Sequence, residues 1–359
     1  MASLKLMNNE MAVSPIVATL VLIVVAVIGA VAVGTIMGTF STDVSKNANT
    51  GQVASASNTE ILVAGSTTVQ PAALKTAQSF MAAHPGIKIT VQGGGSGAGF
   101  QAINNGIVDI GTMSEDYTKN TVKYVVNTGV TLNQFKIGGS GIVVIAHTGT
   151  FASNNITAQS LIASYSDGTT SNSYKLGGAG AIPQTVDAAV SQVDTRSDAS
   201  GTADTFYKVL GYSGQITPTA SKGFQGNEGI LADVQATTGA LGFVDMGYVG
   251  ILSGVTPANI QILGIDDTGA AAAGVKASPV FQTAAKDFLP SAANLKAAAK
   301  NLVNNGKATT GDYPLARGLY FLTNGEPNSV VNSYITYVQS PGAQADFQAA
   351  GMYSMADLA

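Results

Sequence analysis

The sequence predicts an α/β fold preceded by one long hydrophobic N-terminal helix. From Ile61 onward, short apolar strands alternate with helical segments, and this alternation is typical of α/β architecture. Ahead of it, residues 13–40 contain no charged side chain, and a helix from Ile16 would measure roughly 37 Å, enough to cross a bilayer. The chain of 359 residues is long enough for one large two-lobed domain or for two ordinary domains.

The N-terminal region divides into three parts. Residues 1–12 are predicted to be a leader and residues 13–42 the hydrophobic helix. Small residues recur at every fourth position of this helix, at Ala26, Ala30, Gly34 and Gly38. Such a stripe lets another helix pack closely and favours a filament core, whereas the alternative is a plain single membrane anchor. Residues 43–59 are rich in Ser, Thr and Asn without an apolar period, which predicts a polar linker.

Composition excludes several classes of function. Only 11% of residues are charged and the net charge is −4, so there is no basic surface for nucleic acid. The chain lacks cysteine and has two histidines, His84 and His147, which disfavours thiolate or histidine metal sites and most triad hydrolases. Phosphate-loop and nucleophile-elbow motifs are absent as well. These observations predict a protein without cofactor or metal, and they disfavour an enzyme.

The domain opens with three strands that each end at small and hydroxyl residues. The strands are predicted at residues 61–64, 87–91 and 106–111. The first breaks at Gly-Ser-Thr-Thr (65–68) before a helix over 71–83, and the second breaks at a glycine-rich turn (93–97) before a helix through Phe100. Further along, the patterns predict crossing strands at 142–146 and 241–244 and helices at 203–210 and 329–338.

The three strand ends predict an anion site. A helix N-terminus presents unpaired N–H groups and a partial positive charge, glycine lets the backbone approach a ligand, and hydroxyls add donors without net charge. Ligands of open α/β sheets lie off the carboxyl ends of the strands, where these loops must lie. The sequence therefore predicts a small anion held mostly by neutral donors.

A fourth loop adds an arginine. The chain has only two arginines, Arg196 and Arg317, against fifteen lysines. Residues 196–202 (Arg-Ser-Asp-Ala-Ser-Gly-Thr) run into a helix, and the arginine fork suits planar or tetrahedral oxyanions. This stretch alone leaves two interpretations open. One is an anion clamp, and the other is a helix cap by Asp198 or Ser200 with a surface pair between Arg196 and Asp198.

Taken together, these segments resemble the phosphate-binding proteins of ABC importers. The resemblance lies in residues 65–71, 92–97, 109–111, 196–202 and 226–229, with 313–317 (Tyr-Pro-Leu-Ala-Arg) and 323–327 fitting the same family. It implies a class II periplasmic-binding-protein fold, in which two α/β lobes joined by crossing strands close on one phosphate. Lobe 1 is then expected over 60–141 and 245–359, and lobe 2 over 142–244.

The resemblance also implies which residues bind phosphate. They are Thr67, Thr68, Ser96, Ser114, Arg196, Ser200, Gly201 and Thr202. Ser114 stands where some members have an aspartate that accepts the proton of hydrogen phosphate, while others have serine. An acceptor-only carboxylate is what rejects fully deprotonated sulfate, and Glu115 or Asp116 is the nearest alternative for that role.

Four other polar residues are given structural roles. We expect Asp109 to fix a strand end by accepting backbone N–H bonds. Asn227 and Glu228 either line the cleft or cap the following helix, and we favour capping. Arg317 is expected in a structural ion pair or on a carbonyl rather than on the ligand.

The start of the chain shows a second resemblance. Residues 12–17 (Ala-Val-Ser-Pro-Ile-Val) after a short leader resemble archaeal type IV pilin-like proteins, although Met11 stands where many relatives carry a charge. This implies that a prepilin-type peptidase removes the leader near Ala12 while the helix remains.

The two resemblances together imply a function and a location. We expect a phosphate-binding protein on the extracellular face of the membrane or on a surface filament, which delivers phosphate to the membrane subunits of an ABC importer. The alternative is a structural pilin of an extracellular filament with a binding-protein-like outer domain.

Overall fold

The computed structural model describes residues 59–168, 186–198, 200–219, 221–266, 287–307, 309 and 311–359. Residues 58–359 form one unit and residues 1–57 another. The predicted leader, the hydrophobic helix and all of the linker except Thr59 therefore lie outside the described residues. Within the described ranges, no helix has both the length and the apolar character needed to span a membrane.

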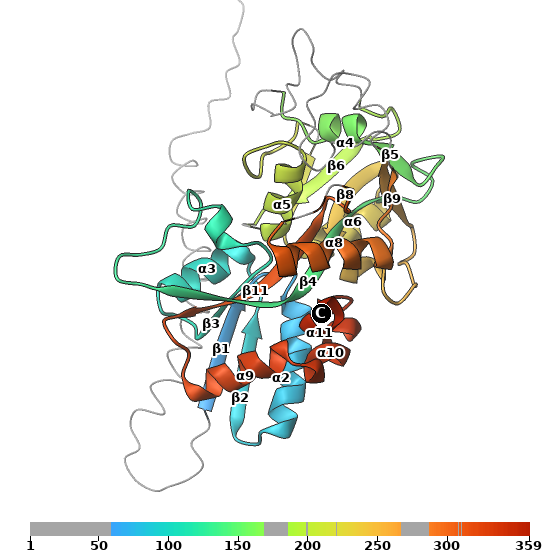
Figure 1. The fold of residues 1–359 in the computed structure, drawn as a ribbon. Coiled ribbons are helices and arrows are strands. Elements are labelled where there is room, and N and C mark those ends of the chain that lie inside the picture. The colour runs from blue at the N-terminus through green and yellow to red at the C-terminus, as the bar shows by residue number, and fades with distance from the viewer. Residues whose placement is uncertain are drawn as a thin grey trace, which may run out of the picture. The chain divides into compact units, whose positions relative to one another are not determined.

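Strands and helices alternate along the described chain (Figure 1). Up to residue 147 they are β1 (Thr59–Gly65), α2 (Gln70–Ala83), β2 (Ile87–Gln92), α3 (Ser96–Asn104), β3 (Ile110–Met113), the 3₁₀ turn η1 (Tyr117–Lys119) and β4 (Leu132–His147). Up to residue 266 they are β5 (Asn155–Thr157), α4 (Ala158–Ser164), β6 (Gln192–Arg196), α5 (Gly201–Val209), β7 (Ser221–Phe224), α6 (Gly226–Ala236), β8 (Ala240–Asp245), η2 (Met246–Val249) and β9 (Ile260–Asp266). The remainder is β10 (Asp287–Phe288), α8 (Ala292–Asn305), β11 (Ala316–Asn324), α9 (Ser329–Gln339), η3 (Pro341–Ala343), α10 (Gln344–Ala349), β12 (Tyr353–Ser354) and α11 (Met355–Leu358).

One mixed sheet runs through two lobes, in the order β2-β1-β3-β11-β4-β8-β6-β7. In the first lobe β1 is parallel to β2 and β3, while β11 is antiparallel to β3. In the second lobe β6 is parallel to β7 and β8. Parallel strands joined through helices explain why α2 and α3 follow β1 and β2, and why α5 follows β6. The α/β prediction is confirmed.

The long strand β4 joins the lobes. Its residues 132–141 pair antiparallel with β11 in the first lobe, and its residues 142–146 pair with β8 in the second. Residues 144–147 of β4 also pair with β9 on the other side. We expected the chain from residue 245 onward to belong to lobe 1, but β9 lies in the second lobe. The chain returns to the first-lobe sheet only at β11, because the apolar side chains of β9 complete the second core.

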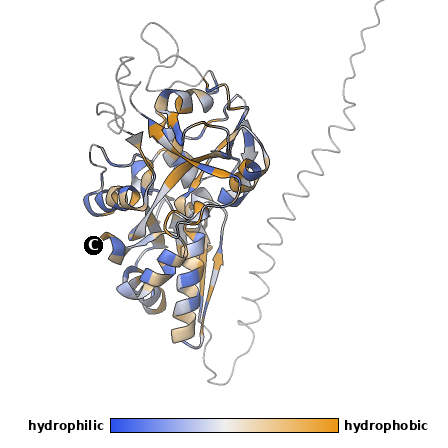
Figure 2. Cartoon of the chain, turned by 90° about the vertical axis from the view of Figure 1, so that its right-hand side faces the viewer, coloured by the Kyte–Doolittle hydropathy of each residue, from blue (hydrophilic) through white to orange (hydrophobic). Residues whose placement is uncertain are grey.

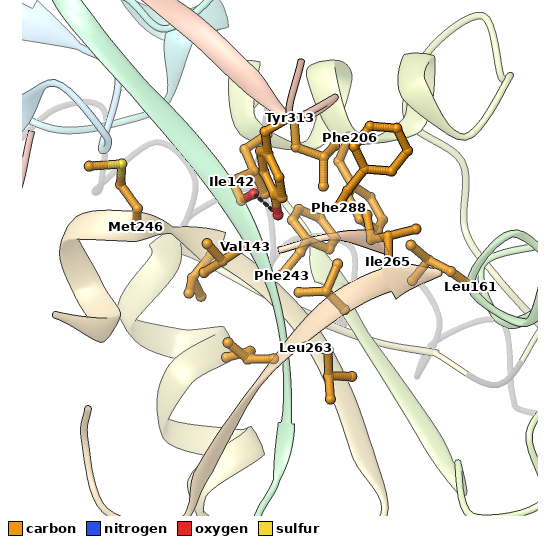
Figure 3. Packing of buried hydrophobic residues seen from close by; sticks show 14 of the residues in the cluster. Ile142, Val143, Leu161, Phe206, Phe243, Met246, Leu263, Ile265, Phe288 and Tyr313 are labelled. Carbon is orange, nitrogen blue, oxygen red and sulfur yellow. Dashed lines mark hydrogen bonds between the residues drawn. The ribbon is translucent and has the colours of Figure 1, made fainter. Parts of the chain in front are cut away.

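The core of the second lobe is the largest of the three described hydrophobic clusters. It gathers side chains from β4, β8, β9, α4 and α5, and Figure 3 labels Phe206, Phe243, Leu263 and Ile265 among them. Tyr313, just before β11, enters the same cluster and donates its hydroxyl hydrogen to the backbone oxygen of Ile142 at 3.0 Å. Two smaller clusters cover opposite faces of the first-lobe sheet, one under α2 and α9 and one under α3. Figure 2 shows the hydrophobic residues concentrated along the strands.

Most expected elements form where the sequence places them, but β3 does not. It begins at Ile110 instead of residue 106, because Gly106 adopts a positive φ of 66° directly after α3 and turns the chain. Asp109 then ties the returning segment to β1, since its carboxylate accepts the N–H of Leu62 at 2.8 Å. The structural role predicted for Asp109 is therefore confirmed.

Candidate anion-binding site

The predicted site residues come from loops of both lobes. Thr67 and Thr68 lie between β1 and α2, Ser96 opens α3, and Ser114 directly follows β3. In the second lobe, Arg196 ends β6, and residues 200–202 start α5. The first-lobe loops follow the parallel strands β1, β2 and β3, and the second-lobe loop follows β6. The loops come together because β4 pairs with strands of both lobes.

Hydroxyl groups of the site contact one another within and between the lobes. Between the lobes, the Oγ1 atoms of Thr68 and Thr202 lie 2.9 Å apart, and within the first lobe the Oγ atoms of Ser96 and Ser114 lie 3.2 Å apart. Gly201 fits directly against the serine pair, because a Cβ atom at this position would lie 2.5 Å from the Ser96 oxygen. A glycine is therefore required where α5 meets the first lobe, since any side chain would push the hydroxyls apart.

Arg196 is buried, with 2% of its surface exposed. Its Nε donates to Asp198 Oδ1 at 2.7 Å, and its Nη2 donates both to the other Asp198 oxygen and to Thr67 Oγ1, the latter at 3.1 Å. Its Nη1 is also buried and has no partner among the described residues. The surface-pair interpretation is therefore wrong, and Asp198 holds the guanidinium toward the first lobe.

Ser200 caps α5, as the second interpretation of this stretch predicted. Its Oγ accepts the N–H groups of Thr202 and Ala203, each at 3.2 Å. The helix cap and the buried arginine coexist in one loop, so the two interpretations of residues 196–202 do not exclude each other.

Arg317 is the residue that sequence reasoning left out of the site. It is 3% exposed and donates from Nη1 to Thr202 at 2.8 Å and Ser114 at 3.2 Å, and from Nη2 to Thr68 at 2.8 Å. Its predicted ion pair also exists, with Asp245 Oδ2 at 2.7 Å. Burial lowers the pKa of Arg317, and the Asp245 carboxylate opposes that shift. The rarity of arginine, which drew attention to Arg196, was the signal available for Arg317 too.

Three further hydrogen bonds hold Asp245 in place. Its Oδ2 accepts the hydroxyl of Ser140 at 2.5 Å, and its Oδ1 accepts the N–H of Gly247 at 3.1 Å. Its own N–H donates to the Oδ1 of buried Asn227 at 3.1 Å. The capping role favoured for Asn227 and Glu228 is wrong, because α6 starts without a side-chain cap. Asn227 instead fixes the end of β8.

The two carboxylates beside Ser114 point to other partners. Glu115 accepts the Tyr124 hydroxyl at 2.5 Å and Lys208 Nζ at 3.0 Å. Asp116 Oδ1 accepts the N–H and hydroxyl of Thr118, at 3.0 and 2.6 Å, and Gln134 Nε2 at 3.0 Å. The acceptor role toward the anion that was considered for Glu115 or Asp116 stays a prediction.

Glu115 belongs to a separate group of charges between the lobes. Lys208 and Asp204 come from α5, and they pair with Glu115 and Lys123 of the first lobe. Burial raises the pKa of Glu115 to about 7, with Asp204 adding to the rise and Lys208 opposing it. We expect the contact that this group makes between the lobes to depend on pH.

Comparison with known proteins shows the superfamily of the chain. Residues 47–341 match the PBP superfamily domain. The chain belongs to the PBP superfamily. No curated protein matches the sequence.

Solved structures share the superfamily fold at low sequence identity. A Clostridium perfringens protein described as a phosphate ABC transporter substrate-binding protein, with bound phosphate, is 21% identical (TM-score 0.55; 82% of this chain and 99% of that chain covered). An ABC-type phosphate transport receptor from Vibrio cholerae is 19% identical (TM-score 0.51; 82% and 99% covered). A human phosphate binding apolipoprotein is 16% identical (TM-score 0.55; 82% and 91% covered).

Replacing Arg317 tests the buried ion pair. We expect Arg317→Ala to lower the free energy of unfolding by about 3–5 kcal/mol, because it leaves Asp245 buried and unpaired. Urea unfolding measures this. The matched control is Lys88→Ala, which breaks the Lys88–Glu60 pair whose lysine side chain is 59% exposed and should cost about 1 kcal/mol or less. Equal losses in the two variants would contradict the role of Arg317.

The raised pKa of Glu115 predicts a pH dependence of stability. The native state holds this proton more tightly than the unfolded state, in which the pKa returns to its ordinary value of 4.5. Stability is therefore lost as the pH rises from about 4.5 to 7, by on the order of 3 kcal/mol for a shift of this size. Urea unfolding of wild type and Glu115→Gln between pH 5 and 8 should show the steeper fall in the wild type. Parallel curves would show that the shift is absent.

Proposed function

We propose that this chain is a phosphate-binding protein of an ABC importer, with Thr67, Thr68, Ser96, Ser114, Arg196, Ser200, Gly201 and Thr202 as its ligand residues on a class II binding-protein fold. One observation carries the proposal. Both arginines of the chain are buried at the junction of the lobes, and each donates to hydroxyls of the opposite lobe. Arg196 also keeps its buried Nη1 without a partner among the described residues.

The chemistry of these groups suits a small oxyanion. Each arginine is paired with one carboxylate, Arg196 with Asp198 and Arg317 with Asp245, so the site carries fixed donors without a large net charge. Guanidinium groups and hydroxyls bind tetrahedral oxygens through charge-assisted hydrogen bonds. The starts of α2, α3 and α5 add the positive ends of three helix dipoles.

The comparisons support phosphate as the ligand and an importer as the partner. The Clostridium perfringens structure contains phosphate, and the Vibrio cholerae protein is a phosphate transport receptor. Because those identities are low, the step to this chain depends on the match between the site residues and the family motifs. We take the ligand and the importer from that match.

The proposal includes attachment to the cell surface through residues 13–42. This segment carries no charge from residue 13 to residue 40 and has the small-residue stripe described above. Single anchoring keeps the binding domain beside an importer, whereas assembly would make the chain a pilin-like filament subunit after peptidase cleavage. The stripe favours assembly, and the buried anion donors favour retained binding.

Ligand binding by the full chain in detergent tests the main proposal. We expect phosphate to bind, and Arg196→Ala to weaken binding by about 2–5 kcal/mol, since it removes one partner of a buried charged contact. Isothermal titration calorimetry measures both. Lys222→Ala is the matched control, because Lys222 pairs with Asp233 at 3.9 Å with more than half of its side chain exposed, and it should bind like the wild type. No heat and no thermal shift at millimolar phosphate would reject the proposal.

The attachment is tested on cells. The protein should sediment with membranes and resist extraction by high salt, because an apolar helix holds it. Replacing Gly34 and Gly38 with Leu should abolish filaments seen by electron microscopy while leaving membrane attachment intact, since larger side chains keep helices apart. Protein found only in the soluble fraction would contradict anchoring. Membrane-bound protein without any filaments would leave the single anchor alone.

A further inference from the structure

We propose that four charged residues outside the anion site form a latch between the lobes, which holds α5 against the first lobe and slows release of the anion. They are Glu115 and Lys123 of the first lobe and Asp204 and Lys208 of α5, and we call this group the interlobe latch. The inference rests on the proposed function, since it names the residues that govern release from the same site.

The latch and the anion site are carried by the same two segments. Glu115 directly follows the site residue Ser114, and α5 contains the site residue Thr202 ahead of Asp204 and Lys208. Asp204 and Lys208 are four residues apart, so they lie on one face of the helix. A shift of α5 away from the first lobe would therefore break the latch contacts and move Thr202 at the same time.

Two ion pairs of opposite sense join the lobes here. Lys123 of the first lobe pairs with Asp204, and Lys208 Nζ of the second lobe pairs with Glu115 Oε2 at 3.0 Å. The other oxygen of Glu115 accepts the hydroxyl of Tyr124 at 2.5 Å. Each lobe thus contributes one carboxylate and one lysine, so both surfaces carry a group that attracts the other.

The carboxylates of the latch are buried, whereas its lysines are half-buried. Glu115 is 7% exposed and Asp204 is 2% exposed, while 31% of the Lys123 side chain and 34% of the Lys208 side chain are exposed. A buried carboxylate without its cation is strongly destabilised, but in an open arrangement water can reach it. The lysines therefore favour the arrangement in which the lobes are in contact.

The two surfaces of the latch belong to different hydrophobic clusters. Tyr124 packs in the first-lobe cluster under α3, whereas Ala203, Phe206 and Tyr207 of α5 pack in the core of the second lobe. Polar contacts between the parts of a chain are compatible with relative motion, because separating them exposes no core. The latch can therefore open and close while both cores remain intact.

The latch lies away from the strands that connect the lobes. Arg317 and Asp245 form their ion pair where β4, β8 and β11 meet, and Arg317 reaches Thr202 near the start of α5. Lys208 lies six residues further along this helix, which corresponds to roughly 9 Å. Rotation of the lobes about the connecting strands would therefore pull the latch residues apart.

Release of ³²P-labelled phosphate from the full chain in detergent tests the latch. At pH 8 most of the Glu115 carboxyl is ionised, since burial raises its pKa to about 7. We expect Lys123→Met and Lys208→Met to release phosphate about tenfold faster with little change in the association rate, because the latch forms after the anion has entered. Lys123→Arg and Lys208→Arg keep the charge and should release phosphate close to the wild-type rate.

Lys222→Met is the matched control, because Lys222 pairs with Asp233 inside the second lobe, and its release rate should equal that of the wild type. Release at the wild-type rate in both latch methionine variants would overturn this inference and leave the proposed function intact. Equally fast release from the arginine variants would overturn it too, since charge would then not be the cause. Absence of phosphate binding by the wild type would reject the proposed function.

A second measurement tests the latch without any anion. The chain has no cysteine, so spin labels can be attached at Gln101→Cys on α3 and Ser213→Cys after α5, two exposed positions in different lobes. Electron–electron resonance should show longer and broader distances between the labels when Lys123→Met or Lys208→Met is added. Unchanged distances, in protein that unfolds as cooperatively as the wild type, would overturn the latch whether or not phosphate binds. If one methionine variant does not fold, the other decides.

Discussion

The buried ion pair between Arg317 and Asp245 is the interaction on which the arrangement of the lobes depends. It lies where β11, β4 and β8 meet, since Arg317 pairs with Ser140 across β11 and β4, and Asp245 pairs with Ile142 across β4 and β8. Further hydrogen bonds stabilise two charges that lie out of water. Here such bonds go to Ser140 and to the site hydroxyls of both lobes, while the buried Nε of Arg317 has no partner among the described residues. The joint between the lobes and the site therefore form one network.

This network explains how a chain with few charges concentrates them at one place. Both of its arginines are buried there, each beside its own carboxylate, and the remaining donors are hydroxyls and helix starts. Such a set binds an anion without a strongly positive surface, in keeping with the net charge of −4. Outside the network, the pairs of α5 with Glu115 and Lys123 add a contact between the lobes, and burial raises the pKa of the Glu115 carboxyl in it.

The sequence predicted the site loops because their signals are local. Glycine, serine and threonine at a strand end followed by a helix determine a loop by themselves, and the residues from Thr67 to Thr202 meet in the structure as expected. The ion pair of Arg317 was predicted, but its contacts with the site hydroxyls and the contact of Asn227 with Asp245 were not, because these partners are distant in the sequence. The second-lobe position of β9 was missed for the same reason, because tertiary packing determines that β9 pairs with β4. Local sequence patterns predict helices, strands and loops, whereas contacts between the lobes depend on the tertiary fold.

A crystal structure of the full chain with phosphate tests the central claim most directly, namely that two arginines of different roles serve one anion. We expect phosphate oxygens within hydrogen-bond distance of Arg196 Nη1 and of the Ser96 and Ser200 hydroxyls. Arg317 would remain paired with Asp245 and would still donate to Thr68 and Thr202. Phosphate bound elsewhere on the chain, or an Arg196 side chain turned to solvent with phosphate present, would contradict it.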